Sequence, residues 1–288
     1  MIPSIENLNK EIKNCLYCGN DDQNNTLILQ KNPLVKMIKC SICKLAYANQ
    51  MPNEIFLKNL YDPKIYKSNL TNNSDKTKKL AQKIYNELEF KHKNIKILDY
   101  GGGNGELSKQ IIELFNKNNI NAESLVVDIY NSLKGEKIYF KSVEEFKFDK
   151  ENFDIVLASA VLEHLPNFIN ILENLLSKVA NNGYFYCRTP WEFELSKLIK
   201  FYKIKWPRHL YDIGGDFWVN FFKNKNDFNI VLSETSVTEI SKKNTLRYFM
   251  AQFLKSISKF EFYLKINKLS LPKWPFVGGW DLIVRKND

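Results

Sequence analysis

Four glycines lie within five positions of this 288-residue chain: Gly101, Gly102, Gly103 and Gly105. They follow Asp99, which ends a short apolar run, and they precede a helical pattern of apolar residues that begins at Leu107. Strand, glycine turn and helix in this order are typical of a nucleotide-binding βα unit. Glycine suits the turn because a backbone without Cβ atoms bends sharply and lets a ligand approach. The free N–H groups of the first helical turn would then face polar atoms of that ligand.

The residues around this turn separate three kinds of ligand. A phosphate-binding NTPase loop would need Gly-Lys-Ser/Thr, whereas Gly105 is followed by Glu106 and Leu107. A dinucleotide site would need G-x-G-x-x-G below a pyrophosphate, which Glu106 would repel at the helix N-terminus. Asp99 suits a ligand that carries a positive or hydrogen-donating group. The remaining candidate is S-adenosylmethionine, which carries an ammonium, a carboxylate, a ribose and a sulfonium but no phosphate.

Residues 97–105 resemble the first motif of class I S-adenosylmethionine-dependent methyltransferases, which reads hydrophobic-hydrophobic-Asp-x-Gly-x-Gly-x-Gly. Four further segments match the family's motifs in order: residues 125–128, 153–159, 161–165 and 182–186. The resemblance implies an α/β fold, with a Rossmann-like, seven-stranded, mostly parallel sheet. Two C-x-x-C pairs, Cys15/Cys18 and Cys40/Cys43, resemble an N-terminal zinc ribbon, and in this combination the chain is similar to methyltransferases of sugar and surface-glycan pathways.

The resemblance also implies which residues hold the cofactor. Asp128 would bind both ribose hydroxyls, since one carboxylate can accept two hydrogen bonds. Ile129 would pack on the adenine ring, and Tyr66, in an aromatic loop, would close over the cofactor; simple packing is the alternative for Tyr66. The predicted cofactor contacts are Tyr66, Asp99, Gly101, Gly103, Gly105, Asp128, Ile129, Ser142, Val143 and Ser159.

Histidines are the candidates for acid–base chemistry. Methyl transfer is an in-line displacement at a sulfonium, so the enzyme positions a nucleophile and, for a hydroxyl, removes a proton. Of the three histidines, His92 lies in a polar run and is expected to be exposed. His164 belongs to the motif at 161–165, directly after the segment 153–159 that matches the family's fourth strand. It is expected at the rim of the pocket. The resemblance places His209 opposite the transferred methyl and makes it the candidate base; the alternative is a histidine packed among aromatic residues.

A basic and aromatic stretch surrounds His209. Its members are Lys197, Lys200, Phe201, Tyr202, Lys203, Lys205, Trp206, Arg208 and Tyr211. Such a mixture suits phosphate pairing and stacking on a base or sugar, and the net charge of +10 also favours an anionic partner. A compositional bias toward lysine would explain that charge equally well.

Three functions remain open on these residues. The leading prediction is methylation, at oxygen, of a nucleotide-linked sugar or a surface-polysaccharide-associated anionic substrate. An RNA base methyltransferase is the alternative, although no Asn/Asp-Pro-Pro-Tyr motif follows the fourth strand. The third is a binding protein with a vestigial cofactor site, which the intact Asp99, glycine turn and Asp128 disfavour.

Two C-x-x-C pairs, Cys15/Cys18 and Cys40/Cys43, stand 21 residues apart. In a cytosolic chain this spacing predicts structural Zn²⁺ bound by four thiolates rather than disulfides. A segment of this length cannot bury enough apolar surface to fold unaided, so the metal would stabilise it. Cys187, far away in the predicted fifth strand, is expected to be a buried core thiol.

The predicted organisation has three parts. Residues 1–50 form the zinc ribbon, 51–92 a helical connector and cofactor lid, and 93–288 the methyltransferase domain. Helices are expected over 53–60 and 74–91, and a helical insertion at about 244–268 would cover the active site or form a dimer contact. No apolar run is long enough for a membrane span, and the first residues lack a secretion signal, so a cytoplasmic location is expected.

Overall fold

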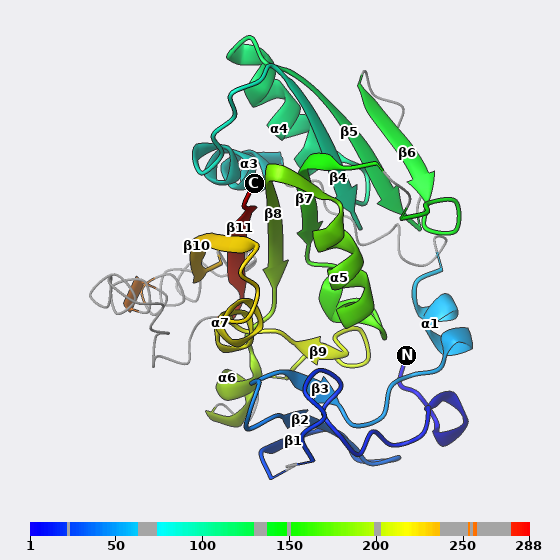
Figure 1. Ribbon diagram of the computed structural model, residues 1–288. Coiled ribbons are helices and arrows are strands. Elements are labelled where there is room, and N and C mark those ends of the chain that lie inside the picture. Colours follow the sequence, from blue (N-terminus) through cyan, green and yellow to red (C-terminus); the bar gives the residue numbers. More distant parts are fainter. Residues whose placement is uncertain are drawn as a thin grey trace.

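The computed structural model describes residues 1–21, 24–62, 74–129, 137–148, 151–198, 203–236, 253, 256–257 and 278–288. Two β-sheets organise these residues, a large central sheet and a smaller one below it (Figure 1). Tyr66 and almost all of the predicted insertion at about 244–268 lie outside the described residues, so both remain predictions.

The large sheet has seven strands in the order β10-β11-β8-β7-β4-β5-β6. The strands are β4 (Asn94–Tyr100), β5 (Asn121–Asp128), β6 (Ile138–Ser142), β7 (Phe153–Ser159), β8 (Val179–Thr189), β10 (Phe228–Thr235) and β11 (Trp280–Lys286). Strands β6, β5, β4, β7 and β8 pair in parallel, whereas β11 runs antiparallel to both β8 and β10. The predicted seven-stranded, mostly parallel sheet is therefore confirmed.

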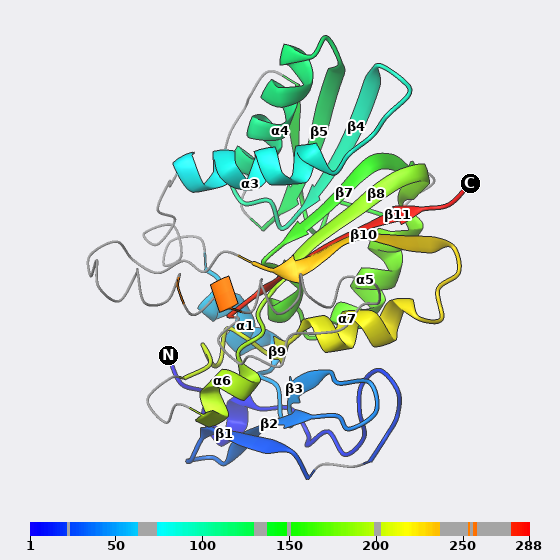
Figure 2. The same ribbon diagram turned by 90° about the vertical axis from the view of Figure 1, so that its left-hand side faces the viewer.

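Helices cover both faces of this sheet, which explains why neighbouring apolar residues in the middle of its central strands are buried. Helices α3 (Ser74–Asn86) and α4 (Glu106–Lys117) lie on one face, and α5 (Phe168–Ser177) and α7 (Gly215–Phe222) on the other (Figure 2). Ile155 and Val156, neighbours on β7, are both fully buried but belong to the cores on opposite faces. A strand buried on both faces has no polar side to alternate with an apolar one.

The smaller sheet combines strands from the N-terminal ribbon with one strand from the predicted methyltransferase domain. Its order is β1 (Thr26–Gln30), β2 (Val35–Lys39), β3 (Ala46–Ala48) and β9 (Tyr211–Asp212), and every pairing is antiparallel. The fourth strand thus comes from residues far beyond the N-terminal ribbon. Tyr17 of the ribbon also packs edge-on against Phe217 of α7, with ring centroids 5.4 Å apart. The ribbon and the large sheet consequently share one hydrophobic core.

The connector begins as predicted and ends differently. Helix α1 (Glu54–Leu60) starts after Asn53, whose side chain accepts a hydrogen bond from the amide of Phe56 at 2.9 Å. Helix α3 ends at Asn86, so the predicted helix over 74–91 is too long. The chain leaves the helix because Glu89 bonds the hydroxyl of Tyr184 on β8 through its amide and its carbonyl, at 3.2 and 3.3 Å.

Three short helical segments complete the described chain: η1 (Ile5–Asn7), η3 (Leu162–His164) and α6 (Phe193–Leu198). Segment η3 directly follows the carboxyl end of β7, and α6 follows β8. In the part of the chain that the structure describes, no helix is both long enough and apolar enough to cross a lipid bilayer.

Candidate cofactor, acceptor and metal sites

The glycine turn lies between β4 and α4 and has a backbone that other residues adopt at a cost. Gly101, Gly103 and Gly105 have φ angles of +71°, +58° and +74°, in the left-handed region. A Cβ atom on Gly101 would lie 2.4 Å from Cγ2 of Val161, whereas a Cβ atom on Gly103 would meet no atom of the described residues within 4 Å. Among these residues, Gly103 therefore borders open space, and Gly101 packs against the segment after β7.

Two carboxylates hold this turn. The amide of Gly103 donates a hydrogen bond to Oδ2 of Asp128, at the end of β5, with a distance of 2.8 Å. Asp99 is 1% exposed and accepts a hydrogen bond from the hydroxyl of Ser108 at 2.7 Å. Burial, with a contribution from the charge of Asp128, raises the pKa of Asp99 to about 6. Asp99 thus lies beneath the turn, whereas Asp128 links it to the neighbouring strand.

The predicted adenine contacts lie beside Asp128. Ile129 is 45% exposed and Val143 37%, and the pairing of β5 with β6 sets Asp128 opposite Ser142. Exposed apolar side chains next to a carboxylate suit a ring that is joined to a ribose. The side chain of Ser142 is itself engaged, because its hydroxyl accepts a hydrogen bond from the amide of Glu145 at 3.2 Å.

A second group of polar residues lies near the glycine turn and is separated from it by Val161. It consists of Glu163 and His164 in η3 and of His209 just before β9, each offering a possible ligand atom within 4.8 Å of the others. The two imidazole rings have centroids 5.2 Å apart. The structure thus brings together the two histidines predicted for catalysis. Ser159 ends β7 two residues before Val161, on the same side of the sheet.

Hydrogen bonds position His164. Its Nδ1 lies 2.8 Å from the carbonyl oxygen of Arg208 and 3.1 Å from the hydroxyl of Tyr61. Tyr61 also donates to the carbonyl of Arg208 at 3.2 Å, so the end of the connector is tied to this pocket. His92, in contrast, lies apart from the group, with Nε2 2.9 Å from Oδ1 of Asp154 and a side chain 53% exposed.

Burial sets the charges within this group. His209 is 7% exposed, and burial, together with the charges of His164, Lys205 and Arg208, lowers its pKa to about 2. Its imidazole is therefore neutral. Glu163 is 3% exposed, and burial raises the pKa of its carboxyl. The sequence analysis assigned no role to Glu163, which lies within the motif at 161–165. Its position directly before His164 is the one feature of the sequence that could have indicated a role.

Glu192 is a further acidic residue that the sequence did not single out. Its Oε2 lies 3.9 Å from Nδ1 of His209, and both side chains are largely buried. Asp212 fixes the backbone there, because its carboxylate accepts the amides of Glu192 and Phe193 at 2.7 and 3.0 Å. No spacing in the sequence connects residues 192 and 209, since the loop between β8 and β9 brings them together.

The ribbon holds the loop that carries His209. The indole Nε1 of Trp206 donates a hydrogen bond to Oε1 of Gln30, on β1, at 3.1 Å. Lys39 of β2 pairs with Asp216 and Glu194, at 2.6 and 3.1 Å. We call the segment 203–210, which carries His209, the acceptor-side loop. This loop contacts the ribbon as well as the residues that follow the large sheet's strands.

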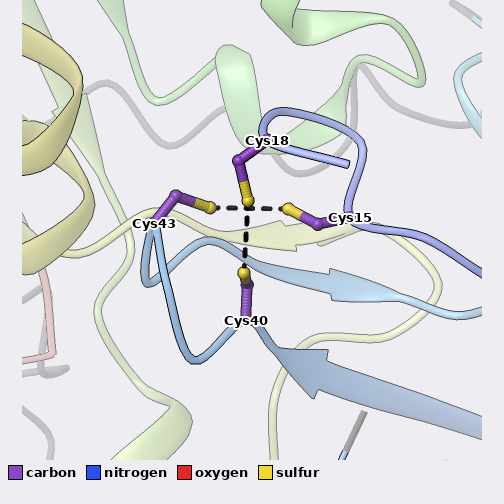
Figure 3. A group of neighbouring side chains, drawn as sticks. All are labelled: Cys15, Cys18, Cys40 and Cys43. Atoms are coloured by element: carbon purple, nitrogen blue, oxygen red, sulfur yellow. Dashed lines mark hydrogen bonds between the residues drawn. The ribbon is translucent and has the colours of Figure 1, made fainter. Parts of the chain in front are cut away.

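The four ribbon cysteines point toward one centre (Figure 3). Their sulfur atoms all lie within 4.8 Å of one another, with Cys15 and Cys43 3.4 Å apart and Cys18 and Cys40 3.5 Å apart. A tetrahedron of thiolates at a Zn–S distance of ~2.3 Å has edges of ~3.8 Å, close to these separations. The residue after each C-x-x-C pair has a positive φ, +73° at Gly19 and +68° at Lys44. Cys187 is a buried thiol of β8, as predicted.

Comparison with known proteins assigns the chain to a family. Residues 72–243 match the family model described as "Methyltransferase domain". This chain belongs to the methyltransferase domain family. Residues 95–190, which carry the motifs identified in the sequence, lie within the matched range. Family and fold together confirm the predicted S-adenosylmethionine-dependent methyltransferase domain.

Individual relatives of this methyltransferase are distant. The malonyl-[acyl-carrier protein] O-methyltransferase of Bacillus cereus is 25% identical over 115 residues, which are 37% of this chain. The match spans only 42% of that relative's length. Among solved structures, the plantazolicin methyltransferase BpumL with SAH and a triazolic desmethylPZN analog has a TM-score of 0.51 and 17% identity, covering 81% of this chain and 95% of that one. Its complex with a pentazolic analog gives 0.50 with the same identity and coverage.

Proposed function

We propose that this methyltransferase transfers the methyl group of S-adenosylmethionine to an oxygen atom of a small anionic acceptor. The acceptor class is a nucleotide-linked sugar or a surface-polysaccharide-associated group. One observation carries the proposal: the glycine turn and the Glu163–His164–His209 group lie side by side, joined by the contact of Val161 with Gly101. The name of the Bacillus cereus relative, an O-methyltransferase, supports oxygen as the acceptor atom.

On the cofactor side, Asp128 accepts hydrogen bonds from the ribose hydroxyls, Ile129 packs on the adenine ring, and Val143 lies at the edge of that ring. Their exposure beside the end of β5 supports these roles. Asp99 supports the turn from below, and Tyr66 closes over the bound cofactor. Calorimetry should show S-adenosylmethionine binding to the wild-type protein and at least a tenfold weaker affinity in Asp128→Ala; unchanged affinity would contradict the assignment.

On the acceptor side, His209 assists removal of the hydroxyl proton and His164 orients the acceptor. A pKa of about 2 makes the imidazole of His209 a weak base on its own, so it requires a partner to act near neutral pH. Lys205 and Arg208, on the same loop, supply positive charge for an anionic acceptor. Lys200, Phe201 and Tyr202 of the predicted basic and aromatic stretch lie outside the described residues.

The four ribbon cysteines hold one Zn²⁺ ion in this proposal. The donor set fits, because four thiolates satisfy the tetrahedral preference of zinc and leave no position for substrate. The metal is therefore structural, and it stabilises the ribbon rather than the reacting groups. Four reduced thiols also support a cytoplasmic location.

The acceptor class is tested with radiolabelled S-adenosylmethionine and two substrate pools, nucleotide sugars and total RNA. We expect label on a nucleotide sugar, at least tenfold reduced by His209→Ala. Label on RNA only, with binding that weakens steeply as salt rises, would replace the sugar proposal by the RNA alternative.

A further inference from the structure

The Glu163–His164–His209 group has the composition of a metal site. Two imidazoles and one carboxylate offer three ligand atoms, all within 4.8 Å of one another. Three protein ligands with open positions are typical of catalytic rather than structural metals. The group is separate from the four cysteines, because it lies between η3 and β9 whereas the thiols come from the two ribbon turns.

The hydrogen bonds of His164 point one lone pair into the group. A carbonyl oxygen can only accept, so Nδ1 carries the proton that is donated to Arg208 at 2.8 Å. In a neutral imidazole Nε2 then bears a lone pair, and it faces Oε1 of Glu163 at 3.8 Å. This gap is too long for a direct hydrogen bond, and a cation bound to both atoms would span it. Histidines that bind metals are oriented by the same Nδ1–H bond to a carbonyl.

Two further atoms of the group lack a hydrogen-bond partner. Oε2 of Glu163 and Nδ1 of His209 are both buried and make no hydrogen bond with the described residues. Buried polar atoms almost always have a protein, water or ion partner. An imidazole nitrogen and a carboxylate oxygen are both common ligands of divalent transition metals.

Charged side chains of both signs surround the group. Lys205 and Arg208 are positive and contribute to the low pKa of His209, and Arg188 lowers the pKa of Glu163. Against them stand the carboxylates of Glu163 and Glu192, the latter 3.9 Å from the ring of His209. Two buried acidic side chains oppose cations whose long side chains can extend toward solvent.

We propose that Glu163, His164 and His209 bind a divalent transition-metal cation, distinct from the metal of the cysteines. Mixed nitrogen and oxygen donors suit Zn²⁺, Co²⁺, Fe²⁺ or Mn²⁺. The group lies near the glycine turn, because Val161, two residues before Glu163, packs against Gly101. A metal there would bind an acceptor hydroxyl and lower its pKa, so that the proton can leave to water; His209 would then act as a metal ligand and not as the base. That use rests on the proposed function, whereas metal binding itself does not.

Metal counting tests the site in the full chain. Protein whose cysteine site is filled with Zn²⁺ is titrated with Co²⁺ and followed by visible absorption and by elemental analysis. We expect one further equivalent per chain, with a spectrum that lacks sulfur-to-metal charge transfer. A single zinc per chain and no added Co²⁺ would overturn the proposal and leave an enclosed water as the partner of the group.

Two variants and a control localise the ion. Glu163→Gln and His209→Ala should lose the Co²⁺ equivalent, with affinity at least tenfold weaker, and keep the zinc. His92→Ala, which removes the exposed histidine outside the group, should keep both metals. Co²⁺ bound equally well by all three variants would place it elsewhere and overturn the proposal. If Co²⁺ binds as expected but no sugar is methylated, the proposed function fails and the metal site stands.

Discussion

The amide of Ala48 donates a hydrogen bond to the carbonyl of Leu210 at 2.9 Å, and Leu210 directly follows His209. Strands β3 and β9 continue this contact, with Ala46 paired to Asp212. Cys43 lies three residues before β3, so a short piece of backbone joins the cysteine centre to the acceptor-side loop. The ribbon thus helps to position His209 through these backbone hydrogen bonds.

Removal of the Zn²⁺ proposed for the four cysteines should loosen this loop without abolishing cofactor binding. Chelation frees the cysteine turns, and the β3–β9 pairing then loses its support. Hydrogen–deuterium exchange of the amides in 203–212 should rise by about tenfold or more, because local opening costs less free energy. Calorimetry should show S-adenosylmethionine affinity within about threefold of the zinc-loaded protein. Equal exchange in both forms would show that the ribbon does not hold the loop.

Alanine at two glycines of the turn should have different effects. Gly101→Ala combines a left-handed backbone with a Cβ atom 2.4 Å from Val161, so we expect a loss of about 2–5 kcal/mol in unfolding free energy. Gly103→Ala meets no neighbour and should cost only about 1–2 kcal/mol, from its backbone alone.

Cofactor affinity separates these two variants further. The open space beside Gly103 is where the cofactor is proposed to lie, so Gly103→Ala should weaken S-adenosylmethionine binding at least tenfold. Urea unfolding and calorimetry measure the two effects on the same samples. Equal losses of stability in both variants would contradict the contact of Gly101 with Val161.

The sequence predicted the sheet and the turn well because their signals are local. The glycines, Asp99 and the apolar strands follow from neighbouring residues, and β7 has the bounds 153–159 that were expected. The early end of α3 was missed because it depends on a hydrogen bond to Tyr184, 95 residues away. The residues around Glu89 give no indication in the sequence that Tyr184 is its hydrogen-bond partner.

The same limit applies to the acceptor group and to the ribbon. His164 and His209 could be singled out by residue type, but their approach to Glu163 and Glu192 depends on how the loop before β9 crosses the sheet. The C-x-x-C spacing predicted four converging thiols from local turns. It did not predict β9, because two residues paired across more than 160 positions of chain leave no periodic signal.

The two ion pairs of Lys39 should stabilise the contact of the ribbon with helices α6 and α7. Its side chain is 9% exposed and its Nζ lies 2.6 Å from Asp216 and 3.1 Å from Glu194. Lys39→Met leaves the carboxylate of Asp216, which is 18% exposed, without its close cation, and should cost about 1–3 kcal/mol of unfolding free energy. Lys58→Met removes an exposed pair with Glu54 on α1 and should leave the urea midpoint unchanged. Equal midpoints for both variants would show that Lys39 contributes nothing.

Asp99 should make the stability of the protein without cofactor depend on pH. Its pKa is about 6 in the folded chain, above the ordinary value of 3.8, so the folded state binds more protons between these limits. The stability it contributes is therefore fully present below about pH 4 and is lost as the pH rises through about 6. Asp99→Asn lacks this titration, and its unfolding free energy relative to wild type should increase by roughly 2–3 kcal/mol across that window and stay constant above it.

Urea unfolding at half-unit steps from pH 4 to 8 measures this difference. Comparison with the variant at each pH cancels the protonation of the cysteine ligands, which both proteins share. Asp75→Asn, at an exposed position in the first turn of α3, is the matched control and should differ from wild type by the same amount at every pH. A difference between Asp99→Asn and wild type that does not change with pH would mean that Asp99 is charged throughout this range. The burial of its carboxylate beneath the turn would then be balanced by a cation that these contacts do not include.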